Sequence, residues 1–357
     1  MRFIALVLSF FLCFLNLGLL QAQVTAPQSE ANQSQELQKN IPVHDPVMMR
    51  QGDTYYLFAT GRGIAVWSSK DRQQWKREEL VFSTAPEWAV QAIPTFKNHI
   101  WAPDISYHKG TYYLYYSVSA FGKNTSAIGL ATNTTLNPMD KNFKWVDHGK
   151  VIQSEPGKTN WNAIDPNLIT DKAGNPYLAF GSFWEGLKLV KLNKDRKSLA
   201  QSIQSLPTIA SRKTEVAASS NLPATTNSPA DAGDNAIEAP FIFKKHGYYY
   251  LFASIDYCCK GVNSTYKIIV GRAKDVQGPY LDKAGKSMVQ GGGTLVLAGN
   301  NNWYGVGHSA TYTFDNQDYL IFHGYDAADK GKSKLRIELL TWDEQEWPIV
   351  SGNAGGK

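Results

Sequence analysis

The sequence predicts an all-β protein, specifically a five-bladed β-propeller, from three observations. An acidic residue or a histidine precedes an aromatic strand five times, about 60 to 70 residues apart. Each aromatic strand follows a turn signal and precedes a further short strand, and no segment shows helical periodicity over three turns. Repeats of a few tens of residues with about four strands each are typical of propellers. The five leading residues are Asp45, Asp104, Asp165, Glu238 and His308.

The repeated strands are rich in tyrosine and phenylalanine, which suit strands of a pleated, partly buried sheet. They are Tyr55–Phe58, Tyr112–Tyr116, Tyr177–Phe180, Tyr248–Phe252 and Tyr319–Phe322. Glycine, asparagine or aspartate marks the turn before each of them. The short strands expected after them are Ile64–Ser68, Ile128–Ala131, Leu187–Lys191, Lys267–Arg272 and Leu335–Thr341.

The ends of the chain and one internal stretch lie outside this pattern. Residues 1–22 carry an early arginine, an apolar run and a small residue, as a secretory signal peptide does; an uncleaved membrane anchor is the alternative. Residues 23–40 are predicted to be a flexible tether, 41–350 the propeller domain and 351–357 a tail. A Ser/Ala/Thr/Pro-rich stretch at about 205–233 lacks strand pattern and predicts a flexible insertion.

Charge and cysteine content exclude some classes of partner. The net charge of +5 is mild and the basic residues are scattered, so we expect neither nucleic acid binding nor lasting membrane association. The 18 Tyr, 16 Phe and 10 Trp residues suit strands and stacking on sugar rings. Outside the apolar run only Cys258 and Cys259 remain, and they are adjacent. They are either free thiols or a vicinal disulfide favoured by export, and a zinc site would need more ligands.

The leading residues predict a crowded polar site. Equivalent positions on five inner strands form a ring at one end of a propeller channel, so the four carboxylates and the histidine should meet there. Such crowding shifts pKa values and is typical of functional sites. Glycoside hydrolysis with inversion needs a base and an acid about 6.5 to 9.5 Å apart. Glu238, the longest carboxylate, is the expected acid, whereas Asp45 and Asp165 both remain candidates for the base. The alternative is that acidic residues before proline simply form turns.

Several segments, in this order, resemble the arabinanases of glycoside hydrolase family 43 from about His44 to Trp347. The resemblance covers nearly all of the chain after the apolar run. The matching segments are His44-Asp45-Pro46, Trp101-Ala102-Pro103-Asp104, 117–132, NAIDPN at 162–167, GSFW at 181–184, NAIEAPFI at 235–242, YCCKGVNSTYKIIVGR at 257–272, GHSA at 307–310 and HGYD followed by LRIELLTW.

The resemblance implies a five-bladed propeller that cleaves α-1,5-linked arabinan internally, with inversion. It matches Asp45 to the general base, Glu238 to the general acid and Asp165 to the residue that tunes and orients the acid. His308 matches a histidine that holds a mostly water-coordinated metal ion, with calcium favoured. Asp104 has no catalytic counterpart, and no organic cofactor is expected.

The resemblance also implies substrate contacts, with Trp101 and Phe121 as stacking platforms unless they belong to the core. The full set is Asp45, Trp101, Phe121, Gly122, Asn162, Ala163, Ile164, Asp165, Ser182, Phe183 and Trp184. The insertion after Arg212 departs from the family pattern and is either inert or part of the cleft rim.

We therefore predict a secreted or periplasmic, monomeric endo-α-1,5-L-arabinanase whose partner is the polysaccharide arabinan. An exo-acting arabinofuranosidase or a xylan-active relative of the same fold is the first alternative. A catalytically silent glycan-binding propeller is the alternative from another class, and the presence of Asp45, Asp165 and Glu238 argues against it.

Overall fold

The computed structural model describes residues 37–214 and 233–350. The predicted signal peptide, almost all of the predicted tether, the tail and most of the predicted insertion lie outside these ranges. No helix within them is long and apolar enough to cross a membrane.

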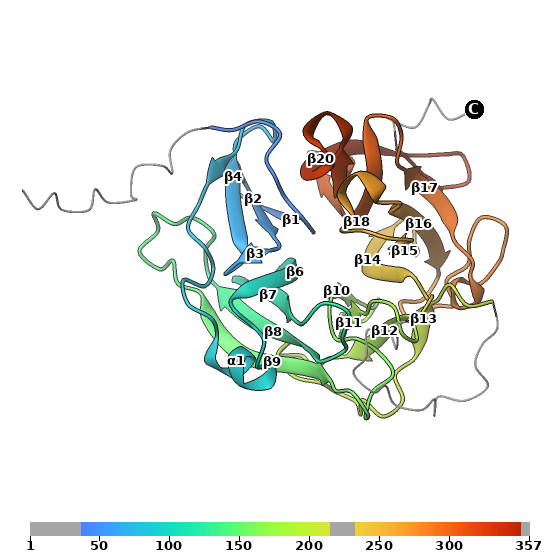
Figure 1. Ribbon diagram of the computed structural model, residues 1–357, viewed down its shortest axis with the longest axis horizontal. Coiled ribbons are helices and arrows are strands. Elements are labelled where there is room, and N and C mark those ends of the chain that lie inside the picture. The colour runs from blue at the N-terminus through green and yellow to red at the C-terminus, as the bar shows by residue number, and fades with distance from the viewer. Residues whose placement is uncertain (1–36, 215–232, 351–357) are drawn as a thin grey trace, which may run out of the picture. The chain divides into compact units, whose positions relative to one another are not determined.

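Five antiparallel sheets surround a common centre, which confirms the predicted five-bladed propeller (Figure 1). Blade 1 consists of β1 (Val47–Gln51), β2 (Thr54–Ala59), β4 (Ala65–Ser69) and β5 (Lys76–Arg77). Blade 2 consists of β6 (His99–His108), β7 (Thr111–Val118), β8 (Ser126–Asn133) and β9 (Val146–Ser154), with β3 (Gly61–Arg62) at the inner edge. Blade 3 consists of β10 (Asn167–Thr170), β11 (Pro176–Phe180), β12 (Leu187–Lys191) and β13 (Thr208–Ala210).

Blade 4 consists of β14 (Ile237–Lys245), β15 (Tyr248–Ile255), β16 (Lys267–Ala273) and β17 (Thr294–Ala298). Blade 5 consists of β18 (Trp303–Phe314), β19 (Gln317–Asp326), β20 (Lys332–Trp342) and β21 (Pro348–Val350). The described helices are all short: α1 (Glu87–Ala92), η3 (Gly261–Asn263), η4 (Met288–Gln290) and η5 (Ala327–Asp329).

All ten strands expected from the sequence are present as the second and third strands of the blades. Apart from β20, which is mostly half-buried, these strands are buried almost continuously instead of alternating: β15 is buried at seven of its eight positions. The physical reason is that each blade packs between two neighbours, so both faces of its sheet leave water. The outer strand β13 falls inside the range 205–233, in which the sequence showed no strand pattern.

The first and last blades are joined by the chain segment that precedes β1. Gln38 pairs with Trp75 of blade 1, and Pro42 forms a bridge with Lys334 of blade 5. The N–H of Leu335 donates to the carbonyl of Ile41 at 3.1 Å. These bonds tie the residues just before Asp45 to β20, so they help to fix where the first inner strand begins.

Candidate active site

The register of the inner strands decides which leading residues are equivalent. In each blade, one residue of the inner strand pairs with the equivalent residue in the middle of the aromatic second strand. These five inner-strand residues are Val47, Asp104, Asn167, Phe241 and Ala310. Two positions earlier the backbone turns into the left-handed region at Asp45 (φ 53°), Asp165 (φ 59°), Ala239 (φ 54°) and His308 (φ 50°).

The predicted ring of five equivalent residues is therefore wrong in two places. Asp104 lies two residues farther along its strand. In blade 2 the residue at the position equivalent to Asp45 is Ala102. Glu238 precedes the left-handed position by one residue, so its side chain leaves the backbone in a different direction from those of Asp45, Asp165 and His308. The sequence repeat did not show these shifts, because the number of residues between the leading residue and its aromatic strand differs from blade to blade. Bulges interrupt β6, β14 and β18 at this point.

A side chain from the preceding blade holds the backbone of three leading residues. The N–H of Asp165 donates to Ser117 Oγ at 3.0 Å, and the N–H of His308 donates to Ser254 Oγ at 2.8 Å. In the first blade, His323 takes the place of these serines: the N–H of Asp45 donates to His323 Nδ1 at 3.1 Å. These hydrogen bonds between neighbouring blades hold Asp45, Asp165 and His308 in the left-handed backbone conformation, which costs free energy in any residue except glycine.

Asp45 is buried among histidines. Its Oδ1 lies 2.8 Å from His44 Nδ1 and 3.0 Å from His308 Nδ1, and its Oδ2 accepts a hydrogen bond from Thr60 Oγ1 at 2.5 Å. Burial acts to raise the pKa of Asp45, but His44 and His308 outweigh burial and hold that pKa well below its usual range. Asp45 is therefore ionised at neutral pH and can accept a proton.

His308 and His323 have opposite electrostatic environments. Burial acts to lower the pKa of His308, but the charge of Asp45 raises it to about 9. His323 is fully buried, and burial together with His44 lowers its pKa well below the usual range. A neutral His323 is consistent with its Nδ1 accepting the N–H of Asp45.

Glu238 and Asp165 lie side by side on neighbouring blades. The N–H of Ala239, next to Glu238, donates to Asp165 Oδ2 at 3.2 Å. Ser182 Oγ and Tyr266 Oη each donate to one oxygen of the Glu238 carboxyl group at 2.7 Å. The Glu238 carboxyl group is thus fixed from two sides, by the loop after β11 and by the start of β16.

Asp165 is the member of this pair whose pKa is raised. Burial is the main reason that the pKa of Asp165 stands well above its usual range; the positive charge of His308 opposes this, and the negative charges of Glu238 and Asp45 add to it. Glu238 is half-buried, whereas Asp165 is only 6% exposed. Glu238 is therefore the member of the pair that can reach a bound molecule.

Four further polar residues complete the cluster and were not singled out from the sequence: Thr60, Tyr266, His323 and Tyr325. The Tyr266 ring lies 5.9 Å from the His323 ring, which stacks on His44 at 3.9 Å between centroids. Aligning the aromatic strands in the sequence would have found two of these four residues, Thr60 and His323. Thr60, Ser117, Ser254 and His323 all come two residues after the strand position that pairs with the inner strand.

The residues expected to contact substrate fall into three groups. Phe121 is 79% exposed, Trp101 and Phe183 are half-buried, and Gly122 lies in the turn after Phe121. Ala163, Ile164 and Trp184 are at most 6% exposed, so their side chains belong to the core. Asn162 is 3% exposed, and its Oδ1 has no hydrogen-bond partner among the described residues.

Asp104 is held in the inner wall of blade 2. Its oxygens accept hydrogen bonds from the N–H of Leu168 at 2.8 Å and from Asn167 Nδ2 at 3.3 Å. Burial raises the pKa of Asp104 to about 7 against the effect of these donors. It therefore links blades 2 and 3.

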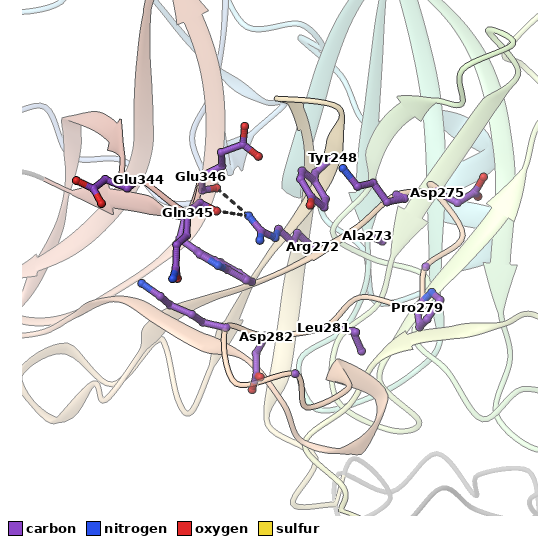
Figure 2. A pocket seen from close by; sticks show the side chains of 15 residues that line it. Tyr248, Arg272, Ala273, Asp275, Pro279, Leu281, Asp282, Glu344, Gln345 and Glu346 are labelled. Atoms are coloured by element: carbon purple, nitrogen blue, oxygen red, sulfur yellow. Dashed lines mark hydrogen bonds between the residues drawn. The ribbon is translucent and has the colours of Figure 1, made fainter.

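A cavity of about 760 Å³ lies elsewhere, between blades 4 and 5 (Figure 2). Tyr248, which lines it, pairs with Lys245, whereas Glu238 pairs with Ser254, so the cavity is at the opposite end of blade 4. Figure 2 shows Arg272 directed at the turn of Gln345 and Glu346, whose carbonyls it binds. None of the predicted site residues lines this cavity.

The propeller and its cluster of carboxylates, with the pKa of Asp45 lowered and that of Asp165 raised, define a class of protein: a glycoside hydrolase. Comparison with known proteins supports this class. The model of the glycosyl hydrolases family 43 matches residues 39–348. This chain belongs to that family.

Characterised relatives cover most of the chain. The extracellular exo-α-(1→5)-L-arabinofuranosidase ArbA of Cellvibrio japonicus is 52% identical over 312 residues, which are 87% of this chain and 87% of that protein. The extracellular endo-α-(1→5)-L-arabinanase 1 of Bacillus subtilis is 45% identical over 313 residues, 87% of this chain and 88% of that protein. The structure of Cellvibrio cellulosa α-L-arabinanase complexed with arabinohexaose matches with a TM-score of 0.82 at 51% identity, covering 88% of this chain and 96% of that chain.

Proposed function

We propose that this protein is an exported hydrolase of α-1,5-linked L-arabinan that acts by single displacement with inversion. The observation that carries the proposal is the contrast between Asp45, whose pKa the neighbouring histidines hold well below its usual range, and Asp165 beside Glu238, whose pKa burial raises well above that range. Inverting hydrolysis needs a base and an acid at the same pH, and these environments supply both.

Asp45 acts as the general base in this mechanism. It removes a proton from a water molecule as the water oxygen forms its bond to the anomeric carbon. Glu238 donates a proton to the glycosidic oxygen as the old carbon–oxygen bond breaks. Ser182 and Tyr266 hold the Glu238 carboxyl group in position, while the buried Asp165, whose pKa is raised, lies beside it and orients the acid.

Arabinan is the proposed substrate because both curated relatives are named for α-(1→5)-L-arabinan chemistry and the matching solved structure holds arabinohexaose. The exposed ring of Phe121 and the half-buried Trp101 and Phe183 would stack on sugar rings. The unpaired Oδ1 of Asn162 is available to a sugar hydroxyl. Export is proposed from the apolar run in residues 1–22 and from relatives named extracellular.

Internal cleavage is the proposed mode, in line with the Bacillus subtilis relative, and exo-action is the second candidate because the Cellvibrio japonicus relative is exo-acting. The products from linear α-1,5-arabinan distinguish them. Internal cleavage gives a mixture of oligomers at the start of the reaction, whereas exo-action gives one short product throughout. No soluble sugar from this substrate would refute both.

The acid assignment has its own test. Glu238→Gln keeps the size of the side chain and one oxygen that can accept from Ser182 or Tyr266, but its amide cannot supply the proton, so we expect kcat to fall by roughly 10²- to 10⁴-fold. The reaction should be followed by NMR, because inversion also predicts that the first product has the opposite anomeric configuration. A variant as fast as the wild type would remove Glu238 from the acid role.

A metal ion, with calcium favoured, is proposed at His308. Its Nδ1 faces Asp45, while its Nε2 has no hydrogen bond within the described residues, so that nitrogen is free for an ion otherwise bound by water. An ion there would supply positive charge beside the carboxylates and hold water in the channel. An ion on Nε2 would displace the proton that the raised pKa of His308 keeps on the ring, and its charge would replace that of the imidazolium beside Asp45.

A further inference from the structure

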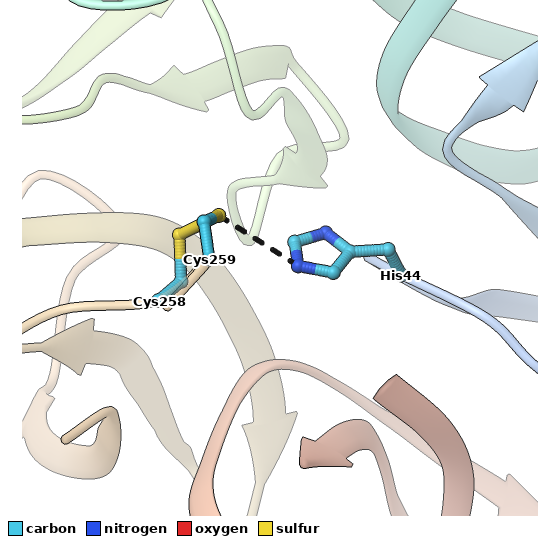
Figure 3. A group of neighbouring side chains, drawn as sticks. All are labelled: His44, Cys258 and Cys259. Carbon is cyan, nitrogen blue, oxygen red and sulfur yellow. Dashed lines mark hydrogen bonds between the residues drawn. A yellow bond between two sulfur atoms is a disulfide. The ribbon is translucent and has the colours of Figure 1, made fainter. Parts of the chain in front are cut away.

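The loop that carries the adjacent cysteines lies over the histidine next to Asp45. Cys258 and Cys259 are joined in a disulfide, with Cα atoms 3.8 Å apart. Cys259 Sγ lies 3.8 Å from His44 Nε2, and Figure 3 shows the disulfide and the imidazole ring facing each other. Two residues 215 positions apart in the chain therefore meet beside the site.

The loop is closed and anchored on blade 5. The N–H of Thr265 donates to the carbonyl of Tyr257 at 3.0 Å, and the N–H of Lys260 donates to Ser264 Oγ at 3.0 Å. Opposite the loop, Gly331 has a φ of 73°, and a Cβ there would come within 2.4 Å of the backbone nitrogen of Val262. The glycine thus allows a close approach between the loop and the turn after β19.

A continuous chain of hydrogen bonds connects this loop to Asp45. The N–H of Cys259 donates to Tyr325 Oη at 2.7 Å, and Tyr325 Oη lies 2.9 Å from His44 Nε2. The other ring nitrogen, His44 Nδ1, lies 2.8 Å from Asp45 Oδ1.

The Tyr325 hydroxyl accepts from the backbone N–H of Cys259 and still has a lone pair and its own proton for His44. It can therefore donate to His44 Nε2 when that nitrogen is bare, or accept from it when it carries a proton. On the other side of the ring, the Asp45 carboxylate can only accept, so the proton on His44 Nδ1 points at Asp45. The two contacts together set the orientation of the His44 ring.

Cys259 itself has a left-handed backbone, with a φ of 65°. A residue with a side chain adopts this conformation only when its surroundings impose it. The covalent link to Cys258 restricts the backbone at this position and so keeps the Cys259 N–H directed at Tyr325.

We propose that Tyr325 and the Cys258–Cys259 disulfide are positioning elements for the proposed catalytic base, acting through His44 on Asp45. The inference rests on the proposed function, since it assigns Asp45 the role of base. It adds residues that do not touch the substrate but determine how the base is held.

Three variants test the proposal, with kcat and KM measured on linear α-1,5-arabinan. Tyr325→Phe removes the hydroxyl and leaves the ring, and Cys258→Ser/Cys259→Ser removes the disulfide. In each we expect kcat to fall roughly 10- to 100-fold with KM nearly unchanged, as for residues that orient a reacting group. The triple variant should be no slower than the slower of the two, because both changes break the same chain.

Tyr280→Phe is the matched control. Tyr280 is equally buried, and its hydroxyl donates to the carbonyl of Val276 at 2.7 Å, away from the carboxylates. The Tyr280→Phe variant should lose as much thermal stability as Tyr325→Phe and keep the wild-type kcat. The intact mass of the unreduced wild type should be that of a disulfide.

Three outcomes overturn the proposal. One is an unchanged kcat in Tyr325→Phe or in the cysteine variant. Another is a raised KM at constant kcat, which would make the loop a substrate contact. The third is equal loss of kcat in Tyr280→Phe. A wild type that releases no sugar from arabinan would instead refute the proposed function, and the inference with it.

Discussion

Asp45 in blade 1 and Asp104 in blade 2 are two buried aspartates that the sequence repeat places at equivalent positions. Asp45 is 7% exposed and Asp104 is 2% exposed, so both lose most of their hydration. Asp45 lies beside two histidines and has a depressed pKa, whereas Asp104 meets only neutral donors and has a pKa of about 7.

The difference shows that neighbours, and not burial, decide what a carboxylate can do in this protein. Burial acts in the same direction on both residues, since it disfavours the charged form. Besides His44 and His308, which hold the pKa of Asp45 down, His323 lies 3.7 Å from Asp45, and His308 and His323 both come from blade 5. Asp104 lies on blade 2, where its partners are Asn167 and the N–H of Leu168.

Replacing each aspartate by asparagine gives the largest contrast. Asp45→Asn should lower kcat on linear arabinan by roughly 10²- to 10⁴-fold, because an amide cannot take a proton from water. Asp104→Asn changes the same functional group at an equally buried site and should keep a kcat close to that of the wild type. Equal losses of activity in the two variants would contradict the distinction between them.

Removing the imidazole beside Asp45 tests the cation site. His308→Ala, or treatment of the wild type with a chelator, should lower activity by roughly 10- to 100-fold. Calcium should restore the chelated wild type but not the variant. If the variant responds to chelator and calcium as the wild type does, the ion is bound elsewhere.

The stability of Asp104→Asn tests its structural role in blades 2 and 3. The new amide would place a donor against the N–H of Leu168 or against Asn167 Nδ2. Asn167 cannot rotate to accept it, because its Oδ1 already receives the N–H of Ile242 at 2.8 Å. We expect the free energy of unfolding to fall by about 1–3 kcal/mol in urea denaturation. An unchanged midpoint would mean that the site adapts.

The pH dependence of stability should show the smallest effect. The pKa of Asp104 is about 7 in the folded protein and near 3.8 when unfolded, so the folded state binds more protons between these values. The contribution of Asp104 is therefore fully present below about pH 4 and is lost as the pH rises through about 7. The free energy of unfolding should be measured against pH for the wild type and for Asp104→Asn, and the difference between them should fall in this range. A difference that rises with pH would mean that the pKa of Asp104 is not raised in the folded protein.

Much of the fold and part of the site could be predicted from local sequence. The aromatic strands and their turns are local features, and five repeats of them indicate five blades. Asp45, Asp165, Glu238 and His308 stood out because they precede those strands. His323 and Tyr325 did not, because their strand looked like one more aromatic strand of the repeat.

The sequence by itself determined the strands, the number of blades and the family, since these depend on periodicity and motifs within each repeat. Only the tertiary structure decided which polar residues share an environment. The register of the inner strands places Asp104 two residues beyond the ring position and Glu238 one residue before it. Of the two histidines that lower the pKa of Asp45, His44 is its sequence neighbour, but His308 lies more than 200 positions away, and no local pattern encodes that contact.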